Sequence, residues 1–296
     1  MENHIREIRI TQRRLEPVEA ELGITVYPEQ LTSTTQVHGR LMGPHCRYAS
    51  TVEVAYPLRE SSRQYEKEGT PHITSRVIIP EASFWDPESP FLYEGPVELW
   101  QKGQLRDQRQ LRHGLRTMNL GPRGLRWNGR LLTIHGAVCH QVTENELLAL
   151  RQAGCNALLA PVEATELWDL ADRLGFLMLG RIADRTSYGR ERKLREHPSC
   201  MGWVLHGQIL QHPIVKDAGV LPVGSLHEQL LGIELNDCPT EPLPESVQFV
   251  VCPEDLLPEL ARIRLPKLVS KATEFVGDKG GQRPAAQPGV LGWVYG

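Results

Sequence analysis

The pattern of apolar and polar residues changes near residue 125, and this change restricts the fold more than any other feature. Before it, short runs of alternating or β-branched residues, such as residues 5–11 and 73–79, are separated by turn-forming residues. This pattern is typical of the short antiparallel strands of a β-sandwich. The highly charged stretch 58–69 is expected to be a solvated loop. The sequence therefore predicts an all-β domain over residues 1–125.

Predicted strands and helices alternate after residue 125. Thr143 and Glu146 form a capping-box pattern at the start of one helix, in which each side chain satisfies a free backbone N–H. Residues 165–174 place apolar side chains on one helical face, and Gly175 ends this helix. The nearly all-apolar run 156–161 is typical of a strand buried on both faces. Alternation of this kind predicts a parallel sheet.

Eight strands are predicted in the second domain, residues 126–296. This domain is shorter than the roughly 200 residues that a (β/α)8 barrel, or TIM barrel, usually needs. We therefore predict a compact barrel in which loops replace some of the helices. In this barrel we assign the fifth strand to residues 221–226, and a helix after the sixth strand to residues 254–263.

Composition argues against several classes of function. The 296 residues carry 36 acidic and 33 basic side chains, a net charge of −3, which is too small to favour nucleic acid or a membrane surface as a partner. The six cysteines form no Cys-x-x-Cys pair, so neither a structural zinc site nor a disulfide scaffold is predicted. The polar start and the expected free thiols predict a cytoplasmic protein, without a cofactor or a bound metal.

Several motifs carry a likeness to a known family. They are residues 84–93 (FWDPESPFLY), 112–116 (RHGLR), 127–130 (WNGR), 134–140 (IHGAVCH) and 195–208 (REHPSCMGWVLHGQ). Together they resemble motifs of glycoside hydrolase family 2, the β-galactosidase and β-glucuronidase family. The resemblance implies an immunoglobulin-like β-sandwich followed by a TIM barrel, and an ancestral activity that hydrolyses O-glycosyl bonds.

The resemblance also implies where catalytic carboxyl groups would lie. A retaining glycosidase uses two carboxyl groups about 5–5.5 Å apart, and in this family they are glutamates at the ends of the fourth and seventh barrel strands. The acid/base position of the family falls on Gln208. A glutamine side chain has no titratable proton and cannot act as a general acid. Loss of general acid–base help lowers a rate by about 10²–10⁴-fold.

The nucleophile position of the family falls on Lys271, at the family's spacing from Pro266. An ammonium group cannot form the covalent glycosyl intermediate, and its charge would repel an oxocarbenium-like transition state. A rival alignment makes Glu274 the nucleophile, but it needs three extra residues after Pro266, and an odd shift reverses the strand face on which a side chain lies. We favour Lys271, and with either residue Gln208 leaves the pair incomplete.

Four further residues are candidates for contacts with a sugar at the barrel mouth, the end of the barrel where the carboxyl ends of the strands lie. His140 matches a histidine at this place in the family. Trp293 matches a tryptophan that serves as a sugar platform, although packing is an equal alternative for it. Trp203 and His206 lie in the motif that leads to Gln208.

These departures from the family lead to an expected function and two alternatives. We expect a non-catalytic pseudoenzyme that binds a carbohydrate or a protein partner at the barrel mouth. One alternative is an active glycosidase that uses other carboxylates near strand ends. The other is a metal-dependent hydrolase with His140 and His206 as ligands, for which a polar barrel mouth is the simpler interpretation. The carboxylates considered for the first alternative are Glu163, Asp184, Glu228 and Glu274.

Overall fold

The computed structural model describes residues 3–65, 69–121, 123–183, 191–206, 229–240, 242–272 and 289–296. The chain forms two compact units, Met1–Arg116 and Thr117–Gly296. The boundary that the sequence predicts near residue 125 falls inside a three-stranded antiparallel sheet of the second unit. The strands of this small sheet are β9 (Met118–Gly121), β10 (Gly124–Trp127) and β11 (Arg130–Leu132).

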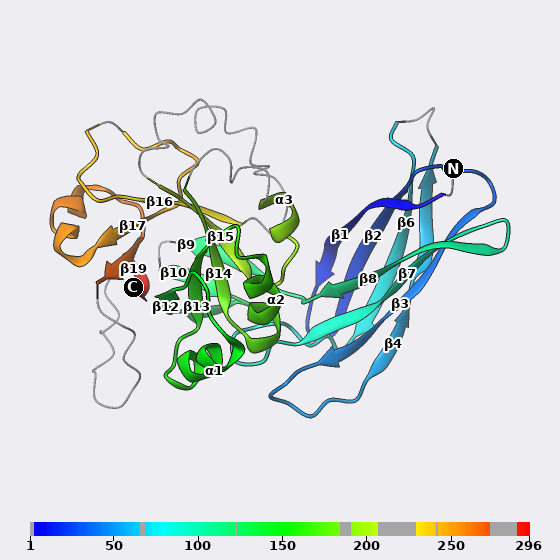
Figure 1. Cartoon of the computed structure of the whole chain (residues 1–296), viewed down its shortest axis with the longest axis horizontal. Coiled ribbons are helices and arrows are strands. Elements are labelled where there is room, and N and C mark those ends of the chain that lie inside the picture. The colour runs from blue at the N-terminus through cyan, green and yellow to red at the C-terminus, as the bar shows by residue number, and fades with distance from the viewer. Residues whose placement is uncertain are drawn as a thin grey trace. The chain divides into compact units, whose positions relative to one another are not determined.

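The first unit contains two four-stranded antiparallel sheets, which can be followed in Figure 1. One sheet has the strand order β1-β2-β6-β5, and the other has the order β4-β3-β7-β8. The strands are β1 (Ile5–Leu15), β2 (Glu19–Pro28), β3 (Thr35–His45), β4 (Val54–Pro57), β5 (Arg59–Gln64), β6 (His72–Pro80), β7 (Leu92–Gln101) and β8 (Gln104–His113).

The core of the first unit lies between these two sheets. Leu22 and Ile24 of β2 and Val97 and Leu99 of β7 are fully buried in one cluster. In each strand the two residues are two positions apart. Their side chains therefore lie on the same face of the sheet, because successive side chains of a strand point to opposite faces. The alternation in the sequence therefore produces the predicted β-sandwich.

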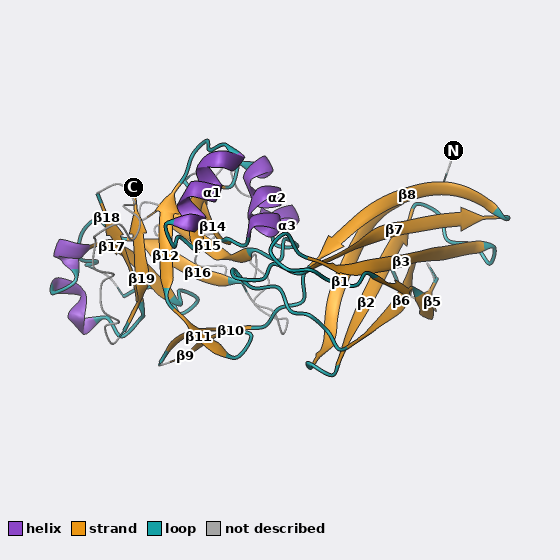
Figure 2. Cartoon of the chain, turned by 90° about the horizontal axis from the view of Figure 1, so that it is seen from below, coloured by secondary structure: helices purple, strands orange, loops and turns teal. Residues whose placement is uncertain are grey.

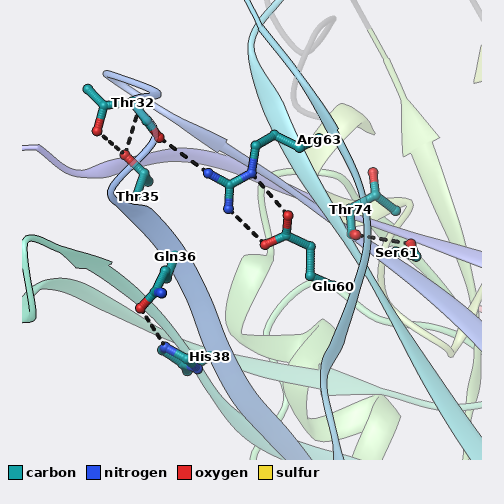
Figure 3. Close-up of polar contacts among 8 residues, drawn as sticks. All are labelled: Thr32, Thr35, Gln36, His38, Glu60, Ser61, Arg63 and Thr74. Carbon is teal, nitrogen blue, oxygen red and sulfur yellow. Dashed lines mark hydrogen bonds and ion pairs between the residues drawn. The ribbon is translucent and has the colours of Figure 1, made fainter.

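One predicted loop is in fact a strand. Strand β5 lies within the charged stretch 58–69 and pairs with β6 at the edge of its sheet. The loop prediction is wrong because backbone hydrogen bonds hold an edge strand from one side, while its exposed faces can carry charged side chains. Arg63 of β5 forms a bidentate ion pair with Glu60 and donates to the carbonyl oxygen of Thr32, as Figure 3 shows.

The second unit contains a closed barrel of eight parallel strands, which confirms the predicted strand number (Figure 2). Each strand pairs with the next along the chain, and β19 pairs with β12 to close the barrel. The strands are β12 (Ile134–Val138), β13 (Ala157–Pro161), β14 (Leu177–Ile182), β15 (Cys200–His206), β16 (Leu230–Glu234), β17 (Phe249–Pro253), β18 (Lys267–Lys271) and β19 (Val290–Tyr295).

Few helices accompany this barrel within the described residues. They are α1 (Glu144–Gln152), α2 (Thr165–Leu174) and the short α3 (Glu191–Leu194). The predicted capping box at α1 is confirmed, because Thr143 Oγ1 accepts from the backbone N–H of Glu146 and the Glu146 carboxylate accepts from that of Thr143. Helices α1 and α2 pack on the outer side of the barrel wall.

Two predicted elements of the barrel need correction. The fifth strand is β16, whereas the predicted residues 221–226 lie outside the described part of the chain. In place of the predicted helix 254–263 there are two 3-10 turns, η3 (Glu254–Leu256) and η4 (Glu259–Arg262). Pro258 lies between them, and proline lacks the N–H that a continuous helix needs there. No helix in the described residues is long and apolar enough to cross a membrane.

Candidate site at the carboxyl ends of the barrel strands

The packing of the barrel wall establishes which side chains face inward. Trp203 of β15 packs on Trp168 of α2, with 5.6 Å between ring centroids, so it faces the outer helix layer. Gly180 of β14 pairs with Trp203, and a Cβ atom on this glycine would lie 2.6 Å from the tryptophan ring. Because side chains alternate along a strand, the next residue, Arg181, lies on the inner face.

The same reasoning places Glu234 on the inner face of β16. Ile233 belongs to an outer cluster that it shares with Leu256 and Leu260 of the 3-10 turns. The following residue, Glu234, is the last of its strand and therefore lies inside the barrel at its carboxyl end. In TIM barrels the side chains of alternate strands share one interior layer, and β14 and β16 are alternate strands.

Arg181 and Glu234 form an ion pair across the strand between them. Nη2 of Arg181 lies 2.8 Å from Oε1 of Glu234, and the two side chains are only 24% and 17% exposed. Nε of Arg181 is buried and has no hydrogen-bond partner among the described residues. Removing two charged groups from water costs free energy. The attraction between the two charges does not repay this cost unless further hydrogen bonds satisfy their remaining donors and acceptors. The Nε atom leaves part of this cost uncompensated among the described residues.

The two histidines that were predicted to contact a sugar both lie at or just after the carboxyl end of a barrel strand. His206 is the last residue of β15, on the same face as Val204, and it is the register partner of Glu234. His140 lies two residues beyond the end of β12 and is exposed. The structure thus places His206 beside the Arg181–Glu234 pair.

The two predicted sugar-contact tryptophans lie in the outer wall. Trp203 packs against α2, as described above. Trp293 of β19 is 2% exposed and stacks on His135, its register partner on β12. His135 lies on the same strand face as Ala137, which belongs to the outer cluster. Neither tryptophan faces the barrel interior: Trp293 packs on His135 and Trp203 packs on Trp168.

Lys271, the residue at the predicted nucleophile position, is the last residue of β18. Its Nζ lies 3.1 Å from Oε2 of Glu254, the first residue of η3. The other catalytic position, Gln208, lies outside the described residues, and so does the alternative nucleophile Glu274.

Of the other carboxylates considered for an active glycosidase, some lie outside the described residues and one lies within them. Asp184 and Glu228 lie outside the described residues. Glu163 is described and exposed, two residues after the end of β13. The two described carboxylates at or directly after a strand end, Glu234 and Glu254, each contact a cationic side chain. Each of these two carboxylates therefore contacts a cation through one of its oxygens.

One cluster of potential metal ligands occurs among the described residues, and it lies elsewhere. Asp169 and Asp172 of α2 and His197 have ligand atoms within 4.8 Å of one another. Asp172 is buried, its Oδ2 lies 2.7 Å from Nδ1 of His197, and its Oδ1 accepts from the backbone N–H of Ser199 at 3.1 Å. These residues precede β15, so they belong to its amino end rather than to the barrel mouth. The histidine-proline-serine motif thus connects α2 to β15.

Sequence reasoning missed Arg181 and Glu234. Each is a charged residue that directly follows an apolar run, residues 176–180 for Arg181 and residues 230–233 for Glu234. This pattern in the sequence could have identified both residues. In a barrel such charges lie at the strand ends where active sites occur.

Comparisons with known proteins agree with the two-part architecture. A family model of the glycosyl hydrolases family 2 matches residues 3–116. A β-galactosidase of Bacteroides ovatus is 27% identical over 173 residues, which are 47% of this chain and 20% of that enzyme. The resemblance to glycoside hydrolase family 2 is confirmed.

Solved structures of family 2 proteins share the fold of nearly the whole chain. A family 2 member from Bacteroides cellulosilyticus superposes with a TM-score of 0.71 at 14% identity, covering 99% of this chain and 44% of that one. A β-glucuronidase of Bifidobacterium dentium superposes with a TM-score of 0.68 at 15% identity, covering 99% and 60%. The chain therefore spans a fifth of its curated relative and about half of these structures.

Proposed function

We propose that this glycoside hydrolase family 2 relative is a non-catalytic protein that binds carbohydrate at the barrel mouth. The family resemblance supports the ligand class, because proteins similar to this chain are named β-galactosidase and β-glucuronidase, and TIM-barrel enzymes carry their active sites at the carboxyl ends of the strands. The sequence supports the loss of hydrolysis, because Gln208 and Lys271 occupy the two positions at which the family has glutamates.

The observation that carries the proposal is which cationic side chains the described carboxylates at strand ends contact, and on which face of the barrel. Glycoside hydrolysis needs one carboxyl group that protonates the leaving oxygen and a second that attacks the sugar or activates water. Glu234 contacts Arg181 at 2.8 Å, and Glu254 contacts Lys271 at 3.1 Å. Lys271 lies on the same strand face as Val269, the register partner of the outer-wall Trp293, so the Glu254–Lys271 contact is on the outer face. Glu234 is thus the described strand-end carboxylate on the inner face, and one carboxylate alone does not make the pair that hydrolysis needs.

The same arrangement supports binding. Protein sites for small ligands place a few convergent polar groups on a rigid wall. The ends of β14, β15 and β16 contribute a guanidinium, an imidazole and a carboxylate on the inner face of the barrel. These groups donate to and accept from hydroxyl groups, which are the polar groups of a sugar.

The proposal is tested by binding and integrity measurements on one sample. Methyl β-D-galactopyranoside and methyl β-D-glucopyranoside are titrated into the full chain by saturation-transfer NMR, and the anomeric signal is followed overnight. We expect saturation transfer to the sugar without loss of the glycoside. Absence of transfer to any sugar removes the carbohydrate proposal and leaves a protein partner as the binding mode to examine. Cleavage of the glycoside supports the active-glycosidase alternative.

A further inference from the structure

We propose that Arg181 and Glu234 form the ligand-recognition pair of the barrel mouth and that they bind two neighbouring hydroxyl groups of a neutral pyranoside. This inference rests on the proposed carbohydrate binding and deepens it, because it names the contacting residues and the chemical group that they recognise. Neither residue belongs to the positions that the family resemblance assigns to catalysis.

The position of the pair is the first argument. Both residues lie on the inner face of the barrel. Arg181 is the last but one residue of β14, and Glu234 is the last residue of β16. Their contact of 2.8 Å crosses the line of β15, whose last residue, His206, is the register partner of Glu234. The pair therefore lies at the end of the barrel where ligand sites occur in this architecture.

The unused hydrogen-bonding capacity of the pair is the second argument. A guanidinium has five N–H donors, and a carboxylate has about four acceptor positions. Nη2 of Arg181 donates to Oε1 of Glu234, while the buried Nε has no partner among the described residues. Buried donors without partners are rare in native structures, and a donor at the mouth of a barrel is placed to bind a ligand.

The chemistry of the pair indicates the ligand. A guanidinium can only donate hydrogen bonds and a carboxylate can only accept them, whereas a hydroxyl group does both. Two hydroxyl groups on neighbouring sugar carbons can therefore contact the pair together, one accepting from Arg181 and the other donating to Glu234. Because the two charges already neutralise each other, the pair favours a neutral sugar over an anionic one.

The experiment measures affinity for methyl β-D-galactopyranoside and methyl β-D-glucopyranoside by calorimetric or NMR titration. We expect Arg181→Met and Glu234→Gln each to weaken the affinity of the preferred sugar at least about tenfold, because each leaves a polar group of the site or the ligand unpaired. We expect a similar loss for one monodeoxy analogue of that sugar with the unmodified protein.

A matched control comes from the β-sandwich unit. Arg112 of β8 contacts Glu94 of β7 at 2.6 Å in another arginine–glutamate pair. Arg112→Met removes the same kind of interaction in a part of the chain that carries no proposed site. We expect this variant to retain the affinity of the unmodified protein.

A charge swap separates binding from folding. The double variant Arg181→Glu with Glu234→Arg restores an ion pair with the opposite orientation. If the pair only supports the barrel wall, the swap recovers the melting temperature and any sugar affinity that the single variants lose. We expect the melting temperature to recover further than the affinity, because the donor and the acceptor have exchanged places relative to the ligand.

Three results would overturn the inference. If the sugar binds and both single variants keep its affinity, the pair is not the recognition element, although the proposed function stands. If Glu234→Gln strengthens the binding of methyl β-D-glucuronide while neutral sugars do not bind, Arg181 recognises a carboxylate. If no sugar binds to the unmodified protein, the proposed function itself fails and the inference fails with it.

Discussion

Tyr93 shows how a single buried residue makes the first unit sensitive to pH. Its side chain is fully buried, and its hydroxyl oxygen accepts from the backbone N–H of Ser83 at 3.0 Å. Burial raises the pKa of Tyr93 to about 12, because a phenolate in the core would lose its hydration. The folded state thus favours the neutral phenol more strongly than the unfolded chain does.

The consequence is a loss of stability at high pH. Because the folded pKa lies above the unfolded value of about 10, the contribution of Tyr93 is complete below pH 10 and is lost as the pH rises toward 12. We expect Tyr93→Phe to reduce the decline of the unfolding free energy over this range by about 2–3 kcal/mol. Chemical denaturation at several pH values measures it, with the exposed Tyr48→Phe as the control. An unchanged decline in Tyr93→Phe would contradict this account.

The cysteines give a second prediction at the scale of residues. Burial raises the pKa of Cys139 to about 11 and that of Cys155 to about 12, and the thiolate is the reactive form. In the native protein at about pH 8 we expect iodoacetamide to modify the partly exposed Cys46 and Cys238 first. Peptide mass spectrometry measures this order. Equal labelling rates before and after unfolding would contradict the buried positions of Cys139, Cys155, Cys200 and Cys252.

At the scale of elements, Arg63 ties an edge strand to a distant turn. It belongs to β5, pairs with Glu60 through two hydrogen bonds, and donates to the carbonyl oxygen of Thr32 in the turn before β3 (Figure 3). We expect Arg63→Met to lower the unfolding free energy by about 0.5–1 kcal/mol, in the range of well-formed exposed ion pairs. Thermal denaturation measures the change. An equal effect of Arg59→Met, at the start of the same strand, would show that the bridge contributes nothing specific.

The connection between α2 and β15 is a stronger case. The buried carboxylate of Asp172 contacts His197 at 2.7 Å and the backbone N–H of Ser199 at 3.1 Å. We expect Asp172→Ala to cost about 1–3 kcal/mol, because it leaves a buried donor without its acceptor. Glu166→Ala, at an exposed position of the same helix, serves as the control. Equal unfolding free energies for the two variants would mean that the buried carboxylate does not stabilise this connection.

The elements also show what the sequence could and could not predict. Helix α2 was predictable because a periodic apolar face and Gly175, with φ 74°, mark its extent. Strand β3 is harder to predict from the sequence, because Gly39 and Gly43 interrupt its alternating pattern. A Cβ atom at Gly39 would lie 2.2 Å from the carbonyl oxygen of Pro96, so this glycine permits close packing of two strands rather than ending one.

At the scale of the whole molecule, the motifs predicted the family and the barrel, but not which side chains face its interior. Trp203 and Trp293 carry the family pattern, yet both lie in the outer wall. A shift of one residue in strand register moves a side chain to the other face, and a motif alone does not define that register. Arg181 and Glu234 were missed for the related reason that strands far apart in sequence bring them together.

The central proposal concerns the whole chain: we propose that a protein with the fold of the family 2 glycosidases binds carbohydrate without hydrolysing it. The most direct test is the release of nitrophenol from a panel of para-nitrophenyl β-glycosides by the purified chain. We predict no release above the rate in buffer alone for any sugar in the panel. Release that depends on the protein and disappears in the Glu274→Gln variant would contradict the claim, because it would identify a working carboxylate.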